Sequence, residues 1–161
     1  MEEWDISFCS MDGILMDDSF KSQPIIQTMD CLTNKVNKIF SFKFGWAKTK
    51  SLLIKTLENC DLCTNDVNKY TFWDVEKPYT RNLVYNCKDY SILILCWSPG
   101  KESKIHNHPS DGCFVKTLRG CIRETRYKME EDSNSLTLSQ TRFYTEGQVS
   151  WMSDDLGLHK V

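Results

Sequence analysis

The sequence lacks several features that would place it in a broad class of proteins. Its longest apolar runs, such as ILILCW at 92–97, fall far short of the roughly 20 residues that a membrane-spanning helix needs. No basic stripe points to nucleic acid, since the formal net charge is −2 and the pI is about 5.9. The amino-terminal stretch MEEWDISFCSMDG lacks the basic-then-apolar layout of a signal peptide, which favours a cytoplasmic protein.

Cysteine, in contrast, is abundant, with eight residues in 161. In the absence of a signal peptide we expect reduced thiols rather than a disulfide framework. Cys60 and Cys63 form a CxxC pair, but neither a second pair nor suitably spaced histidines lie near them, as a zinc site would require. We therefore interpret this pair as ordinary thiols near the end of a helix.

The part of the chain that follows residue 27 has the periodicity of helices. In residues 28–40, and again in residues 48–60, apolar side chains recur at steps of three and four, which places them on one helical face. These positions are Met29, Leu32, Val36, Ile39 and Phe40 in the first segment, and Leu52, Leu53, Thr56 and Leu57 in the second. Residues 64–73 predict a further short helix, capped by Thr64 or Asn65.

Beyond Pro78 the pattern changes to that of short strands. Residues 91–98, SILILCWS, are a β-rich apolar run that leads into a turn, which is typical of a buried strand. Alternating segments follow at 113–119, 121–129, 133–145 and 147–153. The first two of these meet at Gly120, as the strands of a hairpin would. Several short strands at such spacing predict a sandwich or a barrel.

These patterns divide a single, mainly β domain into three parts. We expect a poorly defined amino-terminal segment at 1–27, a helical part at 28–77 and a β-barrel at 78–161.

The chain has only three histidines, and two of them lie two positions apart. In a strand, residues at i and i+2 point to the same side, so His106 and His108 would face one way and Asn107 the other. Inside a barrel, two such imidazoles make a ready pair of metal ligands. The HxH pattern alone is weak evidence, because surface histidines at this spacing are common.

The surroundings of the histidines carry more information. Gly100, His106, His108, Cys113 and Gly120 resemble the first motif of the cupin superfamily, with Cys113 where a glutamate usually stands. Gly147 and then His159 resemble its second motif. The stretches YTRNLV, LILCW, IHNHPSDGCFVKTLRGCIRETRY and DDLGLHKV are similar to the cysteine dioxygenase family, over about residues 53–161 and most strongly from residue 78 onward.

This resemblance implies a cupin barrel, jelly-roll-like, with a helical amino-terminal part. It also implies a ferrous ion, Fe(2+), held by the neutral imidazoles of His106, His108 and His159. Most non-haem ferrous oxygenases use two histidines and a carboxylate. A site without that carboxylate is more positive by one unit, which suits a thiolate substrate. Zinc also accepts three histidines, so the ligand type alone does not select iron.

The resemblance further implies a pocket for an amino acid. Arg81 matches the family's carboxylate-binding arginine. A guanidinium suits this role because it offers a carboxylate two parallel donors. Tyr79 has the same strand parity and is expected in the same pocket, with a packed aromatic as the alternative. Leu95 and Trp97 are expected to form its apolar wall, with an ordinary core position as the alternative.

Cys113 occupies the position at which members of the family form a thioether with a tyrosine. The family's partner tyrosine lies in a serine-x-histidine-x-tyrosine element, which does not occur in this sequence. The sequence stops at Val161, in the second cupin motif, so we expect a carboxy-terminally truncated barrel. We therefore expect Cys113 to remain an uncrosslinked thiol and oxygenase activity to be low.

The implied function is oxidation of L-cysteine by O2 to cysteine sulfinic acid, by a cytoplasmic monomer that binds neither nucleic acid nor membrane. Two alternatives stay open. One is a truncated, inactive cupin that still binds metal, and the other is a dioxygenase for another small thiol, such as 3-mercaptopropionate.

Overall fold

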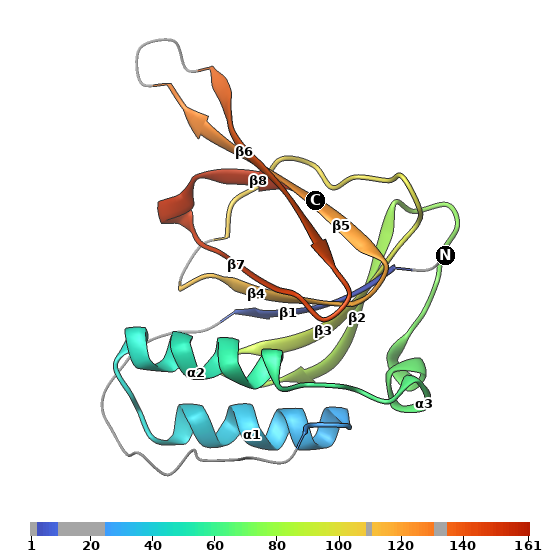
Figure 1. The fold of residues 1–161 in the computed structure, drawn as a ribbon, viewed down its shortest axis with the longest axis vertical. Helices are drawn as coiled ribbons and strands as arrows, with labels where there is room; N and C mark the ends of the chain where they lie inside the picture. Colours follow the sequence, from blue (N-terminus) through green and yellow to red (C-terminus); the bar gives the residue numbers. More distant parts are fainter. Residues whose placement is uncertain (1–2, 10–24, 109–110, 131–134) are drawn as a thin grey trace.

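A computed structural model describes residues 3–9, 25–108, 111–130 and 135–161, with the backbone alone for 3–9. It consists of two antiparallel sheets and a small helical layer packed against the larger sheet (Figure 1). The helices are α1 (Met29–Ser41), α2 (Trp46–Glu58) and α3 (Thr64–Val67), followed by a 3₁₀ turn, η1 (Asn68–Tyr70). No helix among the described residues is long and apolar enough to cross a membrane.

Both long helices form where the periodicity predicts them. The apolar stripe of α1 is buried at Met29, Leu32, Val36 and Ile39, and that of α2 at Leu52, Leu53, Thr56 and Leu57. Thr28 caps α1, since its hydroxyl accepts a hydrogen bond from the Cys31 amide. The predicted cap of α3 is wrong, because that helix already begins at Thr64 and Cys63 takes the capping position without a side-chain hydrogen bond.

Neither cysteine of the CxxC pair forms a disulfide, and both lie beside helix ends as expected. Cys60 follows α2 and is buried, whereas Cys63 precedes α3 and is exposed. Burial raises the pKa of the Cys60 thiol to about 12, so the thiol is unreactive at neutral pH.

The larger sheet has the strand order β2-β3-β1-β4-β7. Its strands are β1 (Glu3–Cys9), β2 (Tyr79–Asn86), β3 (Ser91–Trp97), β4 (Cys113–Arg119) and β7 (Val149–Met152). The central strand, β1, comes from the segment at 1–27, for which the sequence analysis predicted no strand. Its residue Ile6 is paired with Ile94 of β3 on one side and with Lys116 of β4 on the other.

The smaller sheet has the order β6-β5-β8, built from β5 (Cys121–Met129), β6 (Leu136–Thr145) and β8 (Leu158–Lys160). A further 3₁₀ turn, η2 (Asp154–Leu156), precedes β8. The predicted hairpin across Gly120 is wrong, because β4 and β5 belong to different sheets. A tight hairpin needs two turn residues, whereas here Gly120 alone, at φ +85°, turns the chain from one sheet into the other.

Strand β3 shows how the larger sheet separates two environments. Ile92, Ile94 and Cys96 are buried in the core that the sheet shares with the helices. The alternate residues Leu95 and Trp97 face the opposite way, into a cavity between the sheets. The sheet therefore has a helix-covered outer face and an inner face that lines the cavity.

The helical layer gives a direct test of this core. Leu32→Ala, at a fully buried position of α1, should lower the free energy of unfolding by about 2–5 kcal/mol, because it removes apolar contacts and leaves a cavity. Leu83→Ala is the matched control, since that leucine is 61% exposed and its loss should change stability by less than about 0.5 kcal/mol. Urea denaturation measures both values, and equal losses would contradict the assignment of the core.

Candidate metal centre

The three histidines of the chain come together in one cluster. His106 and His159 form an isolated antiparallel bridge, in which each backbone N–H donates to the other's carbonyl at 2.8 Å. The three side chains each offer a ring nitrogen, and these atoms lie within 4.8 Å of one another. The cluster is therefore able to bind a metal ion.

The HxH segment is not part of a regular strand, contrary to the prediction. Its only strand-like pairing is the single bridge at His106, and the residues on either side of it are irregular. His106 and His108 nevertheless reach the same cluster, while Asn107 between them is exposed. The side chains of the HxH segment therefore alternate as in an extended backbone, although the segment lacks regular sheet pairing.

The outer nitrogens of two imidazoles are held by hydrogen bonds. His106 Nδ1 lies 2.9 Å from the carbonyl oxygen of Lys104, and His159 Nδ1 lies 2.8 Å from Oε1 of Glu124. Both partners are acceptors, so each Nδ1 carries the proton and each Nε2 presents a lone pair. His108 Nε2 lies 2.8 Å from His159 Nε2, so His108 donates to the lone pair of His159, and a metal ion would take the place of this hydrogen bond.

Glu124 is the residue that sequence analysis missed. Its carboxylate is 3% exposed and accepts two hydrogen bonds from Arg126, at 2.8 and 3.0 Å. The hydroxyl of Tyr144 also donates to it, at 3.3 Å. Burial alone would raise the pKa of Glu124, but the hydrogen bonds from His159 and Arg126 outweigh it and hold that pKa below its usual value. The carboxylate therefore stays charged behind the imidazole of His159.

A sequence signal for this group did exist. Glu124 and Arg126 are two positions apart in a strand, so they share one face. Two opposite charges on one face of a strand indicate either a solvated surface or a buried ion pair. The sequence does not distinguish these cases, because the outcome depends on how the larger sheet packs against β5.

The imidazoles of His106 and His108 are also kept neutral, as metal ligands must be. Burial lowers the pKa of His108 to about 4, and the positive charges of His159, His106 and Arg81 act in the same direction. Burial likewise lowers the pKa of His106. A metal ion therefore displaces few protons from these two rings at neutral pH.

The cluster opens onto a cavity of about 800 Å³ between the two sheets. All five other residues singled out from the sequence line it: Tyr79, Arg81, Leu95, Trp97 and Cys113. The rings of Tyr79 and Trp97 stack with their centroids 4.2 Å apart, which fixes both side chains on one wall. Cys113 is buried at 3% exposure, whereas Arg81 is exposed. The cavity thus combines a cationic side chain, an aromatic wall and three imidazoles.

Comparison with known proteins agrees with this geometry. A model of the family "Cysteine dioxygenase type I" matches residues 22–161. The chain belongs to the cysteine dioxygenase type I family. Its members are oxidoreductases, and the cupin barrel of the family accounts for the two antiparallel sheets.

The curated relatives differ in how much of them the chain matches. It is 35% identical to cysteine dioxygenase type 1 of Danio rerio over 139 residues, which are 84% of this chain and 67% of that protein. It is 38% identical over 85 residues to the cysteine dioxygenase type 1 of Homo sapiens and to that of Rattus norvegicus. That match spans 52% of this chain and only 42% of each mammalian protein.

The Glu124 contact predicts a measurable effect on this family member's metal affinity. Glu124→Gln keeps the size of the side chain but removes its charge, so the His159 ring loses its anionic partner. Metal affinity, measured by titration with Co²⁺, should fall about 10- to 100-fold. Glu130→Gln, at an exposed site just beyond β5, is the matched control and should leave the affinity unchanged. Equal affinities in all three proteins would contradict a role for Glu124 in holding the ligand.

Proposed function

We propose that the chain is a non-haem iron thiol dioxygenase that oxidises L-cysteine with O2 to cysteine sulfinic acid. The observation that carries this proposal is a cluster of three histidines that shares one cavity with Arg81. The reaction adds both atoms of O2 to one thiol, so atoms and electrons balance without another reductant.

The charge of the cluster favours a thiol substrate. His106, His108 and His159 would hold the ion and bring no negative charge to it. The carboxylate of Glu124 also lines the cavity, but it already accepts hydrogen bonds from His159 and Arg126. It is therefore not expected to bind the ion. A thiolate can then supply the missing anion. Bound iron would provide the redox chemistry, which zinc cannot.

The residues around the cluster would bind and orient the substrate. Arg81 would pair with the α-carboxylate through two parallel hydrogen bonds. Tyr79 lies on the same strand and lines the same cavity, where its hydroxyl can assist that pairing. Leu95 and Trp97 would exclude water from the thiolate. Cys113 lines the cavity as well, and we expect its thiol to remain uncrosslinked.

The alternatives differ in what they require of the same cavity. A dioxygenase for 3-mercaptopropionate would use Arg81 in the same way, but would not need an amino group on the substrate. An inactive family member would retain the metal and form no sulfinate. Because the chain spans less than half of its mammalian relatives, activity has to be measured on this chain itself.

Metal binding by the three histidines is tested by anaerobic loading with ferrous iron. The chain should retain about one iron per molecule, and His106→Ala or His108→Ala should each abolish this. His159→Ala should abolish it as well, because His159 is a buried member of the cluster. Asn107→Ala, between two ligands and exposed, is the control that should keep the iron. Elemental analysis gives the content, and iron retained by both HxH variants would exclude this site.

The substrate class is tested through Arg81. Arg81→Ala should raise the Michaelis constant for L-cysteine about 10- to 100-fold, because a charge-assisted pair contributes roughly 1.5–3 kcal/mol. Cysteamine, which lacks the carboxylate, should be affected far less. Sulfinate formation by mass spectrometry provides the rates for both thiols and for 3-mercaptopropionate. An equal loss for L-cysteine and cysteamine would show that Arg81 does not hold the carboxylate.

A further inference from the structure

Three charged side chains are buried among the residues that the structure describes: Asp66, Lys116 and Glu124. A buried charge is costly unless an opposite charge or several hydrogen bonds surround it. Asp66 accepts hydrogen bonds from the amide of Met29, at the start of α1, and from Lys69 at 2.7 Å. Its partners therefore hold the beginning of a helix and lie outside the metal-binding cavity.

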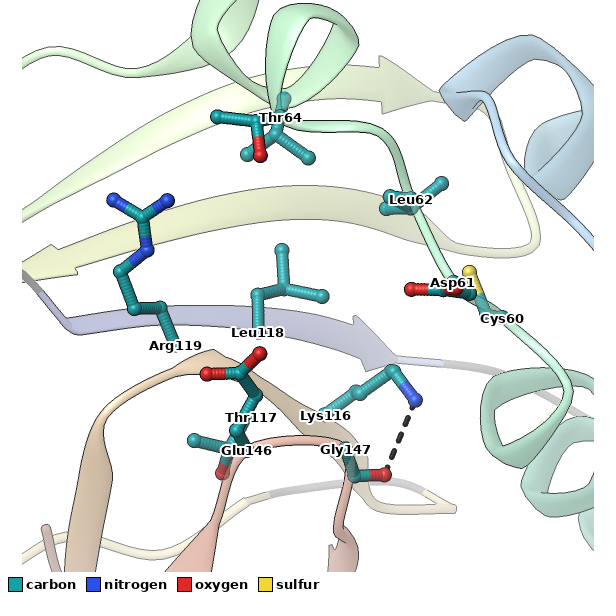
Figure 2. Close-up of a pocket in the computed structure, with 11 residues that line it drawn as sticks. Cys60, Asp61, Leu62, Thr64, Lys116, Thr117, Leu118, Arg119, Glu146 and Gly147 are labelled. Carbon is teal, nitrogen blue, oxygen red and sulfur yellow. Dashed lines mark hydrogen bonds between the residues drawn. The ribbon is translucent and has the colours of Figure 1, made fainter.

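Lys116 lines a small cavity of about 270 Å³ on the other side of β4 from the histidine cluster (Figure 2). Its Nζ donates to the carbonyl oxygen of Gly147 at 3.1 Å. Figure 2 shows Asp61 beside Lys116, and Arg119 and Glu146 on the other side of the cavity. The charges of this cavity therefore balance one another, and none of them lines the cavity of the metal centre.

Glu124 differs from these two, because its counter-ion and a metal-binding histidine share one face of the smaller sheet. In the pairing of β5 with β8, Arg126 lies directly opposite His159, and Glu124 precedes Arg126 by two residues. Directly opposed residues, and residues two apart in a strand, point to the same side of a sheet. The pairing of these strands therefore brings the guanidinium, the carboxylate and the imidazole together.

The two oxygens of the Glu124 carboxylate have separate partners. Oε1 accepts the hydrogen bond from His159 at 2.8 Å, whereas Oε2 accepts two hydrogen bonds from the guanidinium of Arg126, at 2.8 and 3.0 Å. The same guanidinium donates to the carbonyl oxygen of Trp151 at 3.0 Å. The side chain of Arg126 is only 11% exposed, so these bonds are largely shielded from water. Arg126 thus fixes both the position and the orientation of the carboxylate that holds His159.

We propose that Arg126 is a positioning residue of the metal centre, which acts on His159 through Glu124. The inference rests on the metal-binding part of the proposed function and is independent of the substrate. Without Arg126, Oε2 would keep only the hydroxyl of Tyr144, at 3.3 Å, and the carboxylate would be free to rotate away from His159. The imidazole would then lose the contact that directs its Nε2 lone pair toward the other two histidines.

A purely electrostatic role of Arg126 would have the opposite effect. Its guanidinium is positive and lies beside a site for a cation, so its removal would strengthen metal binding if charge alone mattered. Positioning predicts weaker binding, because partners that orient a metal ligand typically contribute about 10- to 100-fold to affinity. The direction of the change in metal affinity therefore separates the two roles.

Titration of four proteins with Co²⁺ tests the proposal: the unsubstituted chain, Arg126→Met, Glu124→Gln and the double variant. Arg126→Met should lower the affinity about tenfold where Glu124 is present. In Glu124→Gln it should lower the affinity by less than about twofold, because the carboxylate through which Arg126 acts is then absent. Lys128→Met removes an exposed positive charge from the same strand and is the control, which should keep the affinity unchanged.

The outcomes that would overturn the proposal are distinct. Equal losses in both backgrounds would show that Arg126 supports only the fold, and tighter Co²⁺ binding by Arg126→Met would show that only its charge matters. Unchanged affinity in Arg126→Met would refute this inference alone. If the unsubstituted chain bound no Co²⁺, the metal centre and this inference would both be refuted.

A second measurement needs no metal. In an NMR spectrum of the ¹⁵N-labelled chain, the Nδ1 proton of His159, identified by its absence in His159→Ala, should exchange slowly with water. The exchange should be faster in Arg126→Met and unchanged in Lys128→Met. Arg126→Lys keeps the charge but not the planar fork of donors, so it should restore part of the protection and part of the Co²⁺ affinity. Should Arg126→Met fail to fold, Arg126→Lys decides, since full protection and full affinity in that variant would overturn the proposal.

Discussion

A buried carboxylate needs partners on all sides, and in this fold the carboxylate of Glu124 joins the parts that make the metal centre. It stands on β5 and receives the Nδ1 proton of His159 from β8. Its other oxygen accepts hydrogen bonds from the guanidinium of Arg126, which also donates to the carbonyl oxygen of Trp151 in β7. Because β7 belongs to the larger sheet, this one carboxylate links the two sheets and sets which nitrogen of His159 is available to an ion.

The second constraint is the two-residue period of the strands in the larger sheet. Strands β3 and β4 each divide their side chains between two compartments, so a single residue step changes the chemistry that a side chain meets. On β3 the step from Ile94 to Leu95 leads from the helical core to the metal-binding cavity. On β4 the step from Val115 to Lys116 leads from that cavity to the smaller, charged one. The two cavities are therefore neighbours across one backbone, and a shift of β4 would alter both.

The features that could be predicted from the sequence are those that short-range patterns determine. The helical stripes of α1 and α2 follow from apolar spacing, and the cluster of His106, His108 and His159 follows from a motif with fixed turns. Other features depend on partners distant in sequence. Glu124 is indistinguishable from a surface charge until β8 and β7 are in place. Strand β1 was not predicted because the alternation of Trp4, Ile6 and Phe8 is short and its partners β3 and β4 lie far along the chain. The prediction of a hairpin across Gly120 is wrong because local alternation does not reveal to which sheet a strand belongs.

The position of β1 in the middle of the larger sheet has a consequence for how the chain acquires its fold. The strand is synthesised before both of its partners, β3 and β4, which leave the ribosome only after the helices and β2 have been made. Until then its backbone donors and acceptors have no ladder to join, and closing so long a loop is slow compared with forming α1 or α2. The nascent chain thus carries an unpaired strand until β3 and β4 have been made, and in that time it is open to wrong pairing with other chains.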